Sequence, residues 1–519
     1  MHYLLDGIIN ALEPLTLLLT VAGVALGLVM AAIPGLTVSM AVVLLLPFTF
    51  YLASKPSLGL LIGVFVGGMA GGAISAILLN IPGNPASVIT NRDGYPMAQK
   101  GRADLALGIA FLSSVLGGAF SLVVLILVAP QIAEIALKFG APEQAALVLL
   151  GLTLVAGFSE GSLRRGLISA GLGLAVATTG MDPITASPRY VFDTVVLQQG
   201  VSFIPVMIGM FALPVAIQSL WDHQRREVRN MTPVVHAMKG VREAFGQLKS
   251  LAGCILRSSA VGTLIGAVPG TGSAVAAILS YQYAERFSKR RDVPFGEGQP
   301  EGIAAPEAAN SALTGGALIP MLVLGIPGDP VTAVMLGALL IQGLTPGVLL
   351  FQNNADIVYG LFGSFAVALA ILAVVGTIGI PLFVRTVRIP VRMLMPAIVL
   401  LCIIGAFALK NSVLDIWIML AFGALAYFMK RWNYPVLPML LALILGPILE
   451  EQFRMSLIIA LGDPFIFLQK PISLTFIVLF VVYLGWSFWR ELGGGKTLTM
   501  EPGRPARAGT RDATEAGEK

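Results

Sequence analysis

Residues 80–90, "NIPGNPASVIT", follow directly on an apolar run that is long enough to span a membrane. Proline lacks a backbone donor and clashes with the preceding helical turn, which costs about 3 kcal/mol in a helix interior. Two prolines around a glycine therefore predict that a helix stops here rather than bends. Open backbone at membrane depth is tolerated only against protein or a water-filled cavity. The segment thus predicts a broken helix that lines a polar site.

The composition of the 519-residue chain supports a membrane setting for this break. Apolar residues make up 56% and charged residues 12% of the chain, and this charged share is about half that of soluble domains. The mean hydropathy of +0.86 fits a chain whose exterior faces lipid. Apolar stretches of span length include 15–33, 38–54, 58–79, 105–129, 201–220, 357–384 and 472–489. We predict an all-α polytopic membrane protein with about twelve transmembrane helices, at roughly 20 residues each.

The opening motif returns later in the chain. Residues 78–88 read "LLNIPGNPASV" and residues 323–333 read "VLGIPGDPVTA", an offset of 245 residues. A second pair, "GLVMAAIPGLTVSMA" at 27–41 and "GTLIGAVPGTGSAVA" at 262–276, has an offset of 235 residues. A lone Pro-Gly motif would indicate only a kink, but two motifs in the same order indicate an internal duplication. We expect two homologous repeats, inverted relative to each other.

A basic segment separates the two halves. Residues 221–257 hold seven Lys and Arg against three acidic residues, which predicts a cytoplasmic location. We therefore divide the chain into a first membrane repeat (1–220), a basic cytoplasmic linker (221–257), a second membrane repeat (258–492) and a disordered polar tail (493–519). The motif "DGYPMAQKG" after the first break and "EGIAAPEAANSA" before the second have no counterparts, so the site that the repeats build need not be symmetric.

Two arrangements fit residues 258–283, which lie between basic segments on both sides. The stretch is long enough for one tilted span but not for two. A re-entrant hairpin with Pro269 and Gly270 at its tip would keep both basic flanks in the cytoplasm. Acidic residues in the second flank obscure the charge balance, and the sequence leaves both arrangements open.

Broken helices in corresponding halves of a transporter predict the chemistry of the site. Helix N-termini present free N–H groups and a partial positive charge, which suit a carboxylate, whereas helix C-termini and unwound carbonyls suit a sodium ion. We expect the substrate-binding residues to be Asn80, Gly83, Asn84, Ser87, Gly325, Gly328, Thr332, Gly35, Thr37, Thr271 and Ser273. Asp329 would repel an anion, so we assign it to cation binding.

Other acidic residues near the motifs have simpler interpretations. Arg92 and Asp93 are expected to pair locally in a loop. Glu301 and Glu307 lie six positions apart, which is not a metal-ligand spacing on a helix, so we expect roles at a loop or helix start, with a gating or ion role as the alternative. Apart from a sodium site, the sequence predicts no metal centre.

The chain resembles the large membrane subunit of the tripartite tricarboxylate transporters, the TctA family. The resemblance covers residues 23–347 at high specificity and rests on the segments "GLVMAAIPGLT", "ILLNIPGNPASVITNRDGYPMAQKG", "GTLIGAVPGTGSAVAAILSYQYAERFSK", "FGEGQPEGIAAPEAANSALTGGALIPMLVLGIPGDPVTAVMLGAL" and "GLTPG". It implies a secondary transporter of the bacterial inner membrane that imports citrate-like tricarboxylates or related carboxylates, coupled to sodium, by alternating access. It also implies two partners: a small TctB-like membrane subunit and a periplasmic TctC-like solute-binding protein.

Competing functional classes fit the sequence less well. All three histidines lie outside the apolar stretches, and "PGTGSA" lacks the lysine of a phosphate-binding loop; we therefore expect no enzyme, no ATP coupling within this chain and no organic cofactor. The net charge of +5 comes without a basic-aromatic pattern, which argues against a nucleic-acid partner. The alternative is a carboxylate-selective channel, or a transporter that works without a binding protein.

Overall fold

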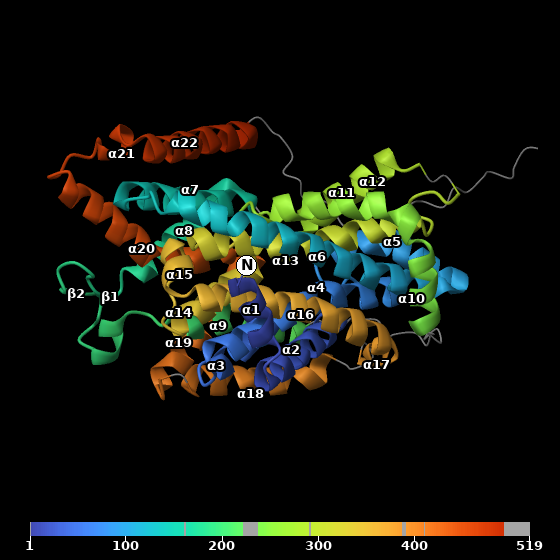
Figure 1. Ribbon diagram of the computed structural model, residues 1–519. Helices are drawn as coiled ribbons and strands as arrows, with labels where there is room; N and C mark the ends of the chain where they lie inside the picture. Colours follow the sequence, from blue (N-terminus) through green and yellow to red (C-terminus); the bar gives the residue numbers. More distant parts are fainter. Residues whose placement is uncertain are drawn as a thin grey trace, which may run out of the picture.

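The computed structural model describes residues 2–159, 162–221, 237–289, 292–386, 391–408 and 410–492, and these are mostly helical (Figure 1). The helices of the first half are α1 (His2–Ala11), α2 (Pro14–Ala32), α3 (Val38–Thr49), α4 (Ser54–Leu79), α5 (Ser87–Met97), α6 (Ala103–Ala136), α7 (Ala141–Phe158), α8 (Leu163–Ala177) and α9 (Phe203–Trp221). A π-helical turn η1 (Ala98–Arg102), a 3-10 helix η2 (Val195–Gln199) and the short antiparallel strands β1 (Gly180–Met181) and β2 (Pro188–Arg189) complete this half.

The second half begins with helices that surround the repeated motifs. It contains α10 (Ala237–Gly246), α11 (Leu248–Gly266), α12 (Gly272–Phe287), α13 (Pro300–Leu324), α14 (Pro330–Ile341), α15 (Val348–Asn353), α16 (Ala355–Ile378), α17 (Ile380–Thr386), α18 (Val391–Ala408), α19 (Val413–Arg431), α20 (Leu437–Ile459), α21 (Ile466–Gln469) and α22 (Pro471–Leu492).

Nine of the described helices are long and apolar enough to cross a membrane, and four more are apolar but shorter. The all-α, polytopic membrane fold is therefore confirmed, while the count of twelve spans stays a prediction. The stretch at 38–54 forms only the 12-residue helix α3, about 18 Å at 1.5 Å per residue. It is too short to cross a bilayer core of about 30 Å by itself.

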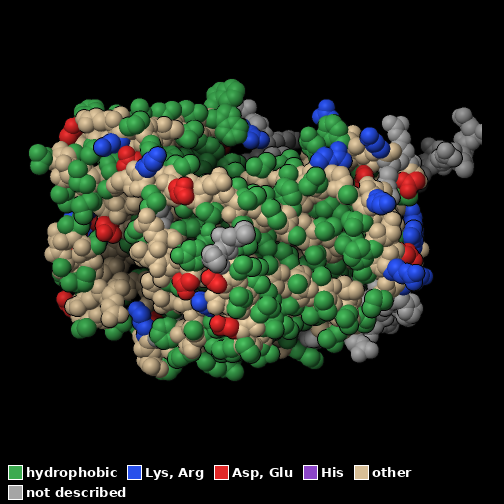
Figure 2. Space-filling view, in the orientation of Figure 1, with side chains coloured by type: hydrophobic (Ala, Val, Ile, Leu, Met, Phe, Trp, Pro, Cys, Tyr) green, Lys and Arg blue, Asp and Glu red, His purple; other side chains and the backbone are tan. Residues whose placement is uncertain are grey.

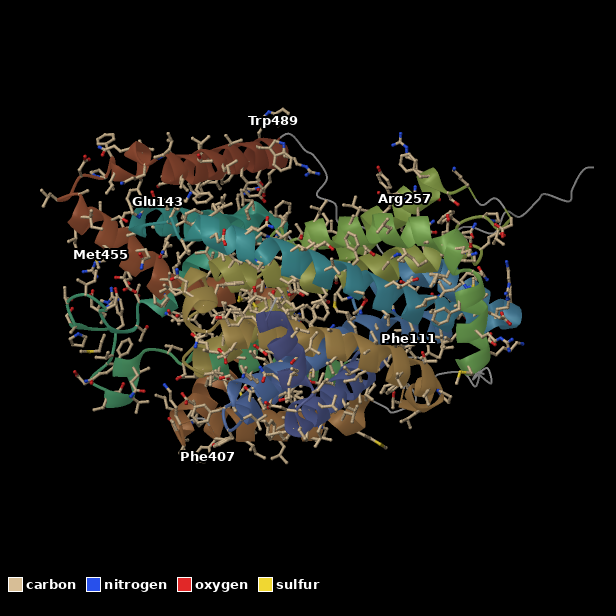
Figure 3. All side chains as sticks on the ribbon, in the orientation of Figure 1. Phe111, Glu143, Arg257, Phe407, Met455 and Trp489 are labelled. Carbon is tan, nitrogen blue, oxygen red and sulfur yellow. The ribbon has the colours of Figure 1, made fainter. Side chains whose placement is uncertain are left out.

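The surface of the molecule fits this environment. Figure 2 shows hydrophobic side chains over most of the middle of one face, with Lys and Arg gathered at the right-hand end. Helix α22 carries a row of exposed aliphatic and aromatic residues, and Trp489 projects outward from its end (Figure 3). Such a helix needs lipid or another apolar partner around it.

Helices α4 and α13 form the centre of the bundle. Every residue of α4 from Pro56 to Leu78 is buried, as is every residue of α13 from Pro300 to Val323. Glycines bring the backbones close: a methyl group at Gly67 would overlap the carbonyl of Val24, and one at Gly316 that of Thr263. Small residues at such crossings are typical of helices that pack within a membrane.

Helices α11 and α12 form an antiparallel hairpin. Residues early in α11 and late in α12 line one small cavity together, among them Cys254 and Ser258 from α11 and Ser280 and Ala284 from α12. The turn between them contains Gly270, whose φ of 82° belongs to the left-handed region that glycine adopts without strain. The chain therefore reverses at the predicted Pro-Gly tip, and the re-entrant arrangement within the membrane stays a prediction.

The two ends of the bundle differ in structure. Strands β1 and β2 lie at the end opposite α10 (Figure 1). Helix α10 and the first ten residues of α11 fall inside the segment predicted as a linker. The rest of that segment at 222–236, like the predicted tail at 493–519, lies outside the described residues. The division into two repeats, linker and tail thus stays a prediction.

Candidate functional site

Asn84 organises the break between α4 and α5. Its Oδ1 accepts hydrogen bonds from the Ser87 backbone N–H at 2.9 Å and from Ser87 Oγ at 2.6 Å, and its Nδ2 donates to the Met69 carbonyl at 3.2 Å. Ser87 is the first residue of α5, so the Asn84 side chain bonds to the start of that helix in the manner of an N-cap and ties it to the buried helix α4. Asn84 and Ser87 are both buried, and both were predicted from the sequence as site residues.

Asp329 has the same place in the second motif. Its Oδ1 accepts from the Thr332 N–H at 2.8 Å and from Thr332 Oγ1 at 2.7 Å, while the Asp329 N–H donates to Thr332 Oγ1 at 3.0 Å. This is a reciprocal capping box at the start of α14. A negative charge also interacts favourably with the partial positive charge of a helix N-terminus. Much of the hydrogen-bonding capacity of Asp329 is therefore used by its own helix.

The helices that lead into the two breaks end alike. Helix α4 ends at Asn80 with a φ of 57°, and α13 ends at Gly325 with a φ of 70°. Asn and Gly are the residues that adopt this left-handed C-terminal conformation at low cost. Asn80 is exposed, whereas Gly325 is buried. Asn80 and Gly325, both predicted as substrate-binding residues, therefore end the helices α4 and α13.

Each motif packs against the Pro-Gly turn of its own half. A methyl group at Gly83 would overlap the Ala31 carbonyl at the end of α2, and one at Gly328 would overlap the Gly266 carbonyl at the end of α11. The Gly328 carbonyl also accepts from the Gly270 N–H at 3.0 Å. The two kinds of motif that repeat in the sequence thus meet in space.

The other predicted site residues lie at these turns. Gly35 has a φ of 94°, and Thr37 Oγ1 accepts from the Met40 N–H to cap α3. Thr271 Oγ1 donates to the Ile265 and Val268 carbonyls at the end of α11. Ser273 lies half-buried in the first turn of α12. Thr37 and Thr271 therefore have local structural contacts at the predicted positions.

The first motif also meets the middle of α13. The Met69 carbonyl that accepts from Asn84 accepts a second hydrogen bond, from Asn310 Nδ2 at 2.8 Å. Thr90, the last residue of the first motif, donates through Oγ1 to Glu307 Oε1 at 2.7 Å. Among the described residues, no hydrogen bond joins the first motif to the second. Thr90 thus bonds directly to the segment 301–312, which has no counterpart in the other half, and Asn84 shares the Met69 carbonyl with Asn310 of that segment.

Glu307 is a functional candidate for which the sequence favoured a role at a loop or helix start over a gating or ion role. It is fully buried in α13, where its Oε2 also accepts from Ser114 Oγ of α6 at 3.4 Å. We expected a role at a loop or helix start, and the structure instead places it two turns inside a helix. The spacing to Glu301 did not indicate a buried site at Glu307. The polar side chains three, four and seven residues later could have indicated one, because they share its helix face: Asn310, Ser311 and Thr314.

Asp93 holds α5 to a distant segment. Its Oδ1 accepts from the backbone N–H groups of Gly296, Gly298 and Gln299 at 2.7–3.0 Å, and its Oδ2 accepts from Tyr281 Oη at 2.7 Å. The expected local pairing in a loop is therefore wrong. Several backbone N–H groups focused on one carboxylate make a strong, charge-assisted anchor.

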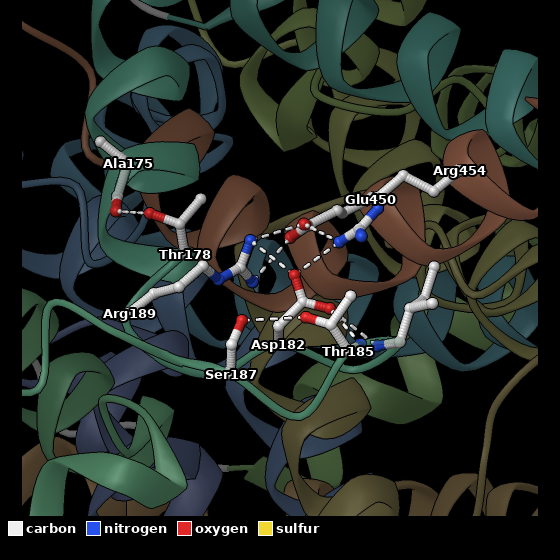
Figure 4. Close-up of polar contacts among 9 residues, drawn as sticks. Ala175, Thr178, Asp182, Thr185, Ser187, Arg189, Glu450 and Arg454 are labelled. Carbon is white, nitrogen blue, oxygen red and sulfur yellow. Dashed lines mark hydrogen bonds and ion pairs between the residues drawn. The ribbon is translucent and has the colours of Figure 1, made fainter.

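A cluster of ion pairs lies at the end of the bundle that carries β1 and β2. Figure 4 shows Asp182, Arg189, Glu450 and Arg454 in alternation; Arg189 pairs with Glu450 at 2.6 Å and Arg454 with Asp182 at 2.6 Å. Two backbone N–H groups, foremost that of Thr185, and the Arg454 guanidinium hold the pKa of Asp182 well below its usual range. Arg189 and Glu450 also line a cavity of about 340 Å³.

Comparisons with known proteins agree with the resemblance. The family model described as "Tripartite tricarboxylate transporter TctA family" matches residues 17–441, which extends beyond the region of the specific motifs. An Agrobacterium vitis protein named "Uncharacterized 52.8 kDa protein in TAR-I ttuC' 3'region" is 35% identical over 467 residues, 90% of this chain and 92% of that protein. A second, "Uncharacterized protein in TAR-II ttuC' 3'region", is 37% identical over 221 residues, 43% of this chain and 91% of its own length. No solved structure matches.

Proposed function

This chain belongs to the tripartite tricarboxylate transporter TctA family, and we propose that it is the large membrane subunit of a secondary transporter that imports tricarboxylates or related carboxylates. It works in a bacterial inner membrane with a TctB-like small subunit and a TctC-like periplasmic binding protein. Sodium is the coupling ion, and the mechanism is alternating access. The observation that carries the proposal is the pair of broken helices, in each of which the residue at the same motif position bonds to the start of the next helix.

The geometry of the two breaks supports an internal duplication. Equivalent positions have equivalent roles: Asn80 and Gly325 end helices, and Asn84 and Asp329 cap the next ones. Gly83 and Gly328 contact the ends of α2 and α11 at matching positions. Paired discontinuous helices of this kind form the substrate and ion sites of transporters built from repeats. We therefore assign the substrate site to the two breaks.

The difference between the two caps indicates where the anion binds. The start of α14 already has the Asp329 carboxylate, which would repel a second anion. The start of α5 has only the neutral side chains of Asn84 and Ser87. A substrate carboxylate therefore fits the α5 end, held by backbone N–H groups and neutral donors. Such a site releases an anion more readily than a buried arginine pair would.

Uptake of labelled citrate by sealed vesicles tests the proposal. The vesicles contain this chain with the candidate small subunit, with binding protein outside and an inward sodium gradient present or absent. Accumulation above equilibrium that requires both supports the tripartite, sodium-coupled transporter. A panel of other di- and tricarboxylates follows if citrate is not taken up, and failure of the whole panel contradicts the substrate class.

Two other outcomes point to the alternatives. Flux that only equilibrates the carboxylate across the membrane, indifferent to sodium and binding protein, indicates a channel. Accumulation that is unchanged without the binding protein indicates a transporter that works alone. Either result contradicts the tripartite assignment.

A further inference from the structure

Glu307 is a buried carboxylate without a cationic partner. Its side chain is fully buried in α13, and none of the ion pairs formed by the described residues includes it. An isolated buried carboxylate is very costly unless it is neutralised or paired with a cation. Two hydroxyl donors, Thr90 and Ser114, supply hydrogen bonds but no positive charge. The folded protein therefore either protonates this carboxyl group or places a cation beside it, and the oxygens around it favour the cation.

Side chains with unpartnered oxygens lie on the same face of α13 as the carboxylate. Residues three, four and seven positions apart share one face of a helix, so Asn310, Ser311 and Thr314 lie on the Glu307 face of α13. Among the described residues, Asn310 Oδ1, Ser311 Oγ and Thr314 Oγ1 are buried without a hydrogen-bond partner, as is Ser113 Oγ on α6. Each of these four residues is more than nine-tenths buried. Unsatisfied acceptors at this density are rare in a native fold.

The chemistry of the cluster fits a small monovalent cation. Every available ligand atom is oxygen, the preference of hard cations. Within the described residues no three His, Cys, Asp or Glu side chains converge, so the single carboxylate balances one positive charge. We propose that the Glu307 cluster (Glu307, Thr90, Ser114, Asn310, Ser311 and Thr314) binds a sodium ion. The sodium site itself does not depend on the proposed function. Only the role of this sodium as the coupling ion of transport rests on that function.

The other buried acids are poorer candidates for the same role. Asp329 lies at the N-terminus of α14, where the helix dipole already favours its charge, and no buried side-chain oxygen of the described residues 325–333 lacks a hydrogen-bond partner. Asp93 already accepts four hydrogen bonds. Glu301 lies six residues before Glu307, which on a helix places it on a different face, about 240° around the axis. The coupling-ion site therefore belongs at Glu307, in place of the assignment to Asp329 from the sequence.

The position of the cluster explains how an ion could be coupled to a substrate. Thr90 is in the same short helix as Ser87, at the α5 end proposed for the carboxylate. The Met69 carbonyl connects Asn84 of that site with Asn310 of the cluster. A cation on Glu307 fixes Thr90 and α5, and its charge partly offsets that of the bound anion.

Direct binding of ²²Na⁺ to the purified full chain tests the site without requiring transport. We expect saturable binding by the wild-type protein, and a loss of affinity of roughly tenfold or more in Glu307→Gln. Thr314→Val removes one hydroxyl at nearly constant shape and should weaken binding by a smaller factor. Glu143→Gln is the matched control, because Glu143 is also buried but caps α7 through Gly140. Thermal unfolding of each variant checks that it is folded.

The results distinguish failure of the site from failure of the proposed function. Sodium binding that is absent from the wild type, or equally tight in Glu307→Gln and Thr314→Val, overturns the sodium site. If Glu307→Gln does not fold, Thr314→Val alone decides the question in the same way. Sodium binding that depends on Glu307 in a protein that takes up no carboxylate supports the site and contradicts the transport function.

Discussion

At the scale of single residues, one position of the repeated motif holds an asparagine in the first half and an aspartate in the second, and the two differ in charge. Asn84 and Asp329 occupy equivalent places, and each accepts a hydrogen bond from the backbone N–H three residues later, although only Asp329 forms a reciprocal capping box. Only Asn84 has an amide that donates to a second element, at the Met69 carbonyl. A neutral cap leaves the helix N-terminus able to attract an anion, whereas a charged cap does not. The difference of one side chain makes the two breaks chemically unequal.

Truncation of this cap gives the first prediction. Asn84→Ala removes the acceptor for Ser87 but leaves the Met69 carbonyl bonded to Asn310. We expect a loss of about 1 kcal/mol in stability, the usual value of an N-cap, with a fall in the thermal unfolding midpoint in detergent. Carboxylate uptake should fall much further than this small destabilisation explains. Uptake equal to that of the wild type would limit Asn84 to a structural role.

At the scale of elements, the halves resemble each other through close helix contacts. The same three parts occur twice: a helix that ends in a left-handed residue, a short irregular segment with a glycine, and a second helix. In both cases the glycine of the segment lies against the end of a helix from the preceding Pro-Gly motif. These contacts leave no room for a side chain, so the two glycines should respond to substitution alike.

Alanine at these glycines gives the second prediction. Gly83→Ala and Gly328→Ala would each place a methyl group on a backbone carbonyl, that of Ala31 or Gly266. We expect each to destabilise the protein by about 1–3 kcal/mol, typical of overpacking, as measured by thermal unfolding and by yield from the membrane. Gly171→Ala in α8 is the control, because its methyl group meets open space and alanine favours a helix. A tolerated Gly83→Ala with a damaging Gly328→Ala would contradict equivalent packing.

At the scale of the whole molecule, the bundle has two distinct ends. One end carries α10 and the other the strands β1 and β2 with the Asp182 cluster (Figures 1 and 4). The basic composition of residues 221–257 predicts that the α10 end faces the cytoplasm. The β1–β2 end then faces the side from which a binding protein would deliver substrate.

Labelling of single cysteines tests this orientation. Val195 in η2 and Met238 in α10 are exposed, while the native Cys254 and Cys402 are buried and should react slowly. We expect a membrane-impermeant maleimide to label Val195→Cys in intact spheroplasts and to label Met238→Cys only after permeabilisation. The reverse pattern would invert the topology.

The Asp182 cluster should make the β1–β2 segment resistant to moderate acid. Because the folded-state pKa of Asp182 is depressed, its stabilisation is fully present above its unfolded pKa of about 4. It is lost only as the pH falls through the lower folded value. Amide exchange of residues 180–189, corrected for intrinsic rates, should therefore stay slow down to about pH 4.

Two substitutions check this assignment. Asp182→Asn loses the ion pair with Arg454. In this variant the amides of residues 180–189 should exchange faster at neutral pH, and their exchange should change less as the pH is lowered. Asp193→Asn changes an exposed acid four residues beyond this segment and should match the wild type. Equal exchange in Asp182→Asn and wild type would show that the ion pairs do not stabilise the segment.

The sequence by itself determined the membrane environment, the helical class, the family and the positions of both breaks. These follow from local causes: apolar run length, the missing donor of proline, and glycine or asparagine where a helix ends in the left-handed region. Asn84, Ser87 and Thr332 were selected from the repeated motif, and their hydrogen bonds at the helix starts join residues only three positions apart.

Only the tertiary structure revealed the partners of Asp93 and Glu307. Asp93 meets backbone N–H groups more than two hundred residues away, and Glu307 meets Thr90 from another helix. In the sequence, both look like acids of ordinary loops or helix starts. Their charge becomes significant because packing removes them from water. Burial and long-range contact are properties of the assembled bundle, and no local pattern encodes them.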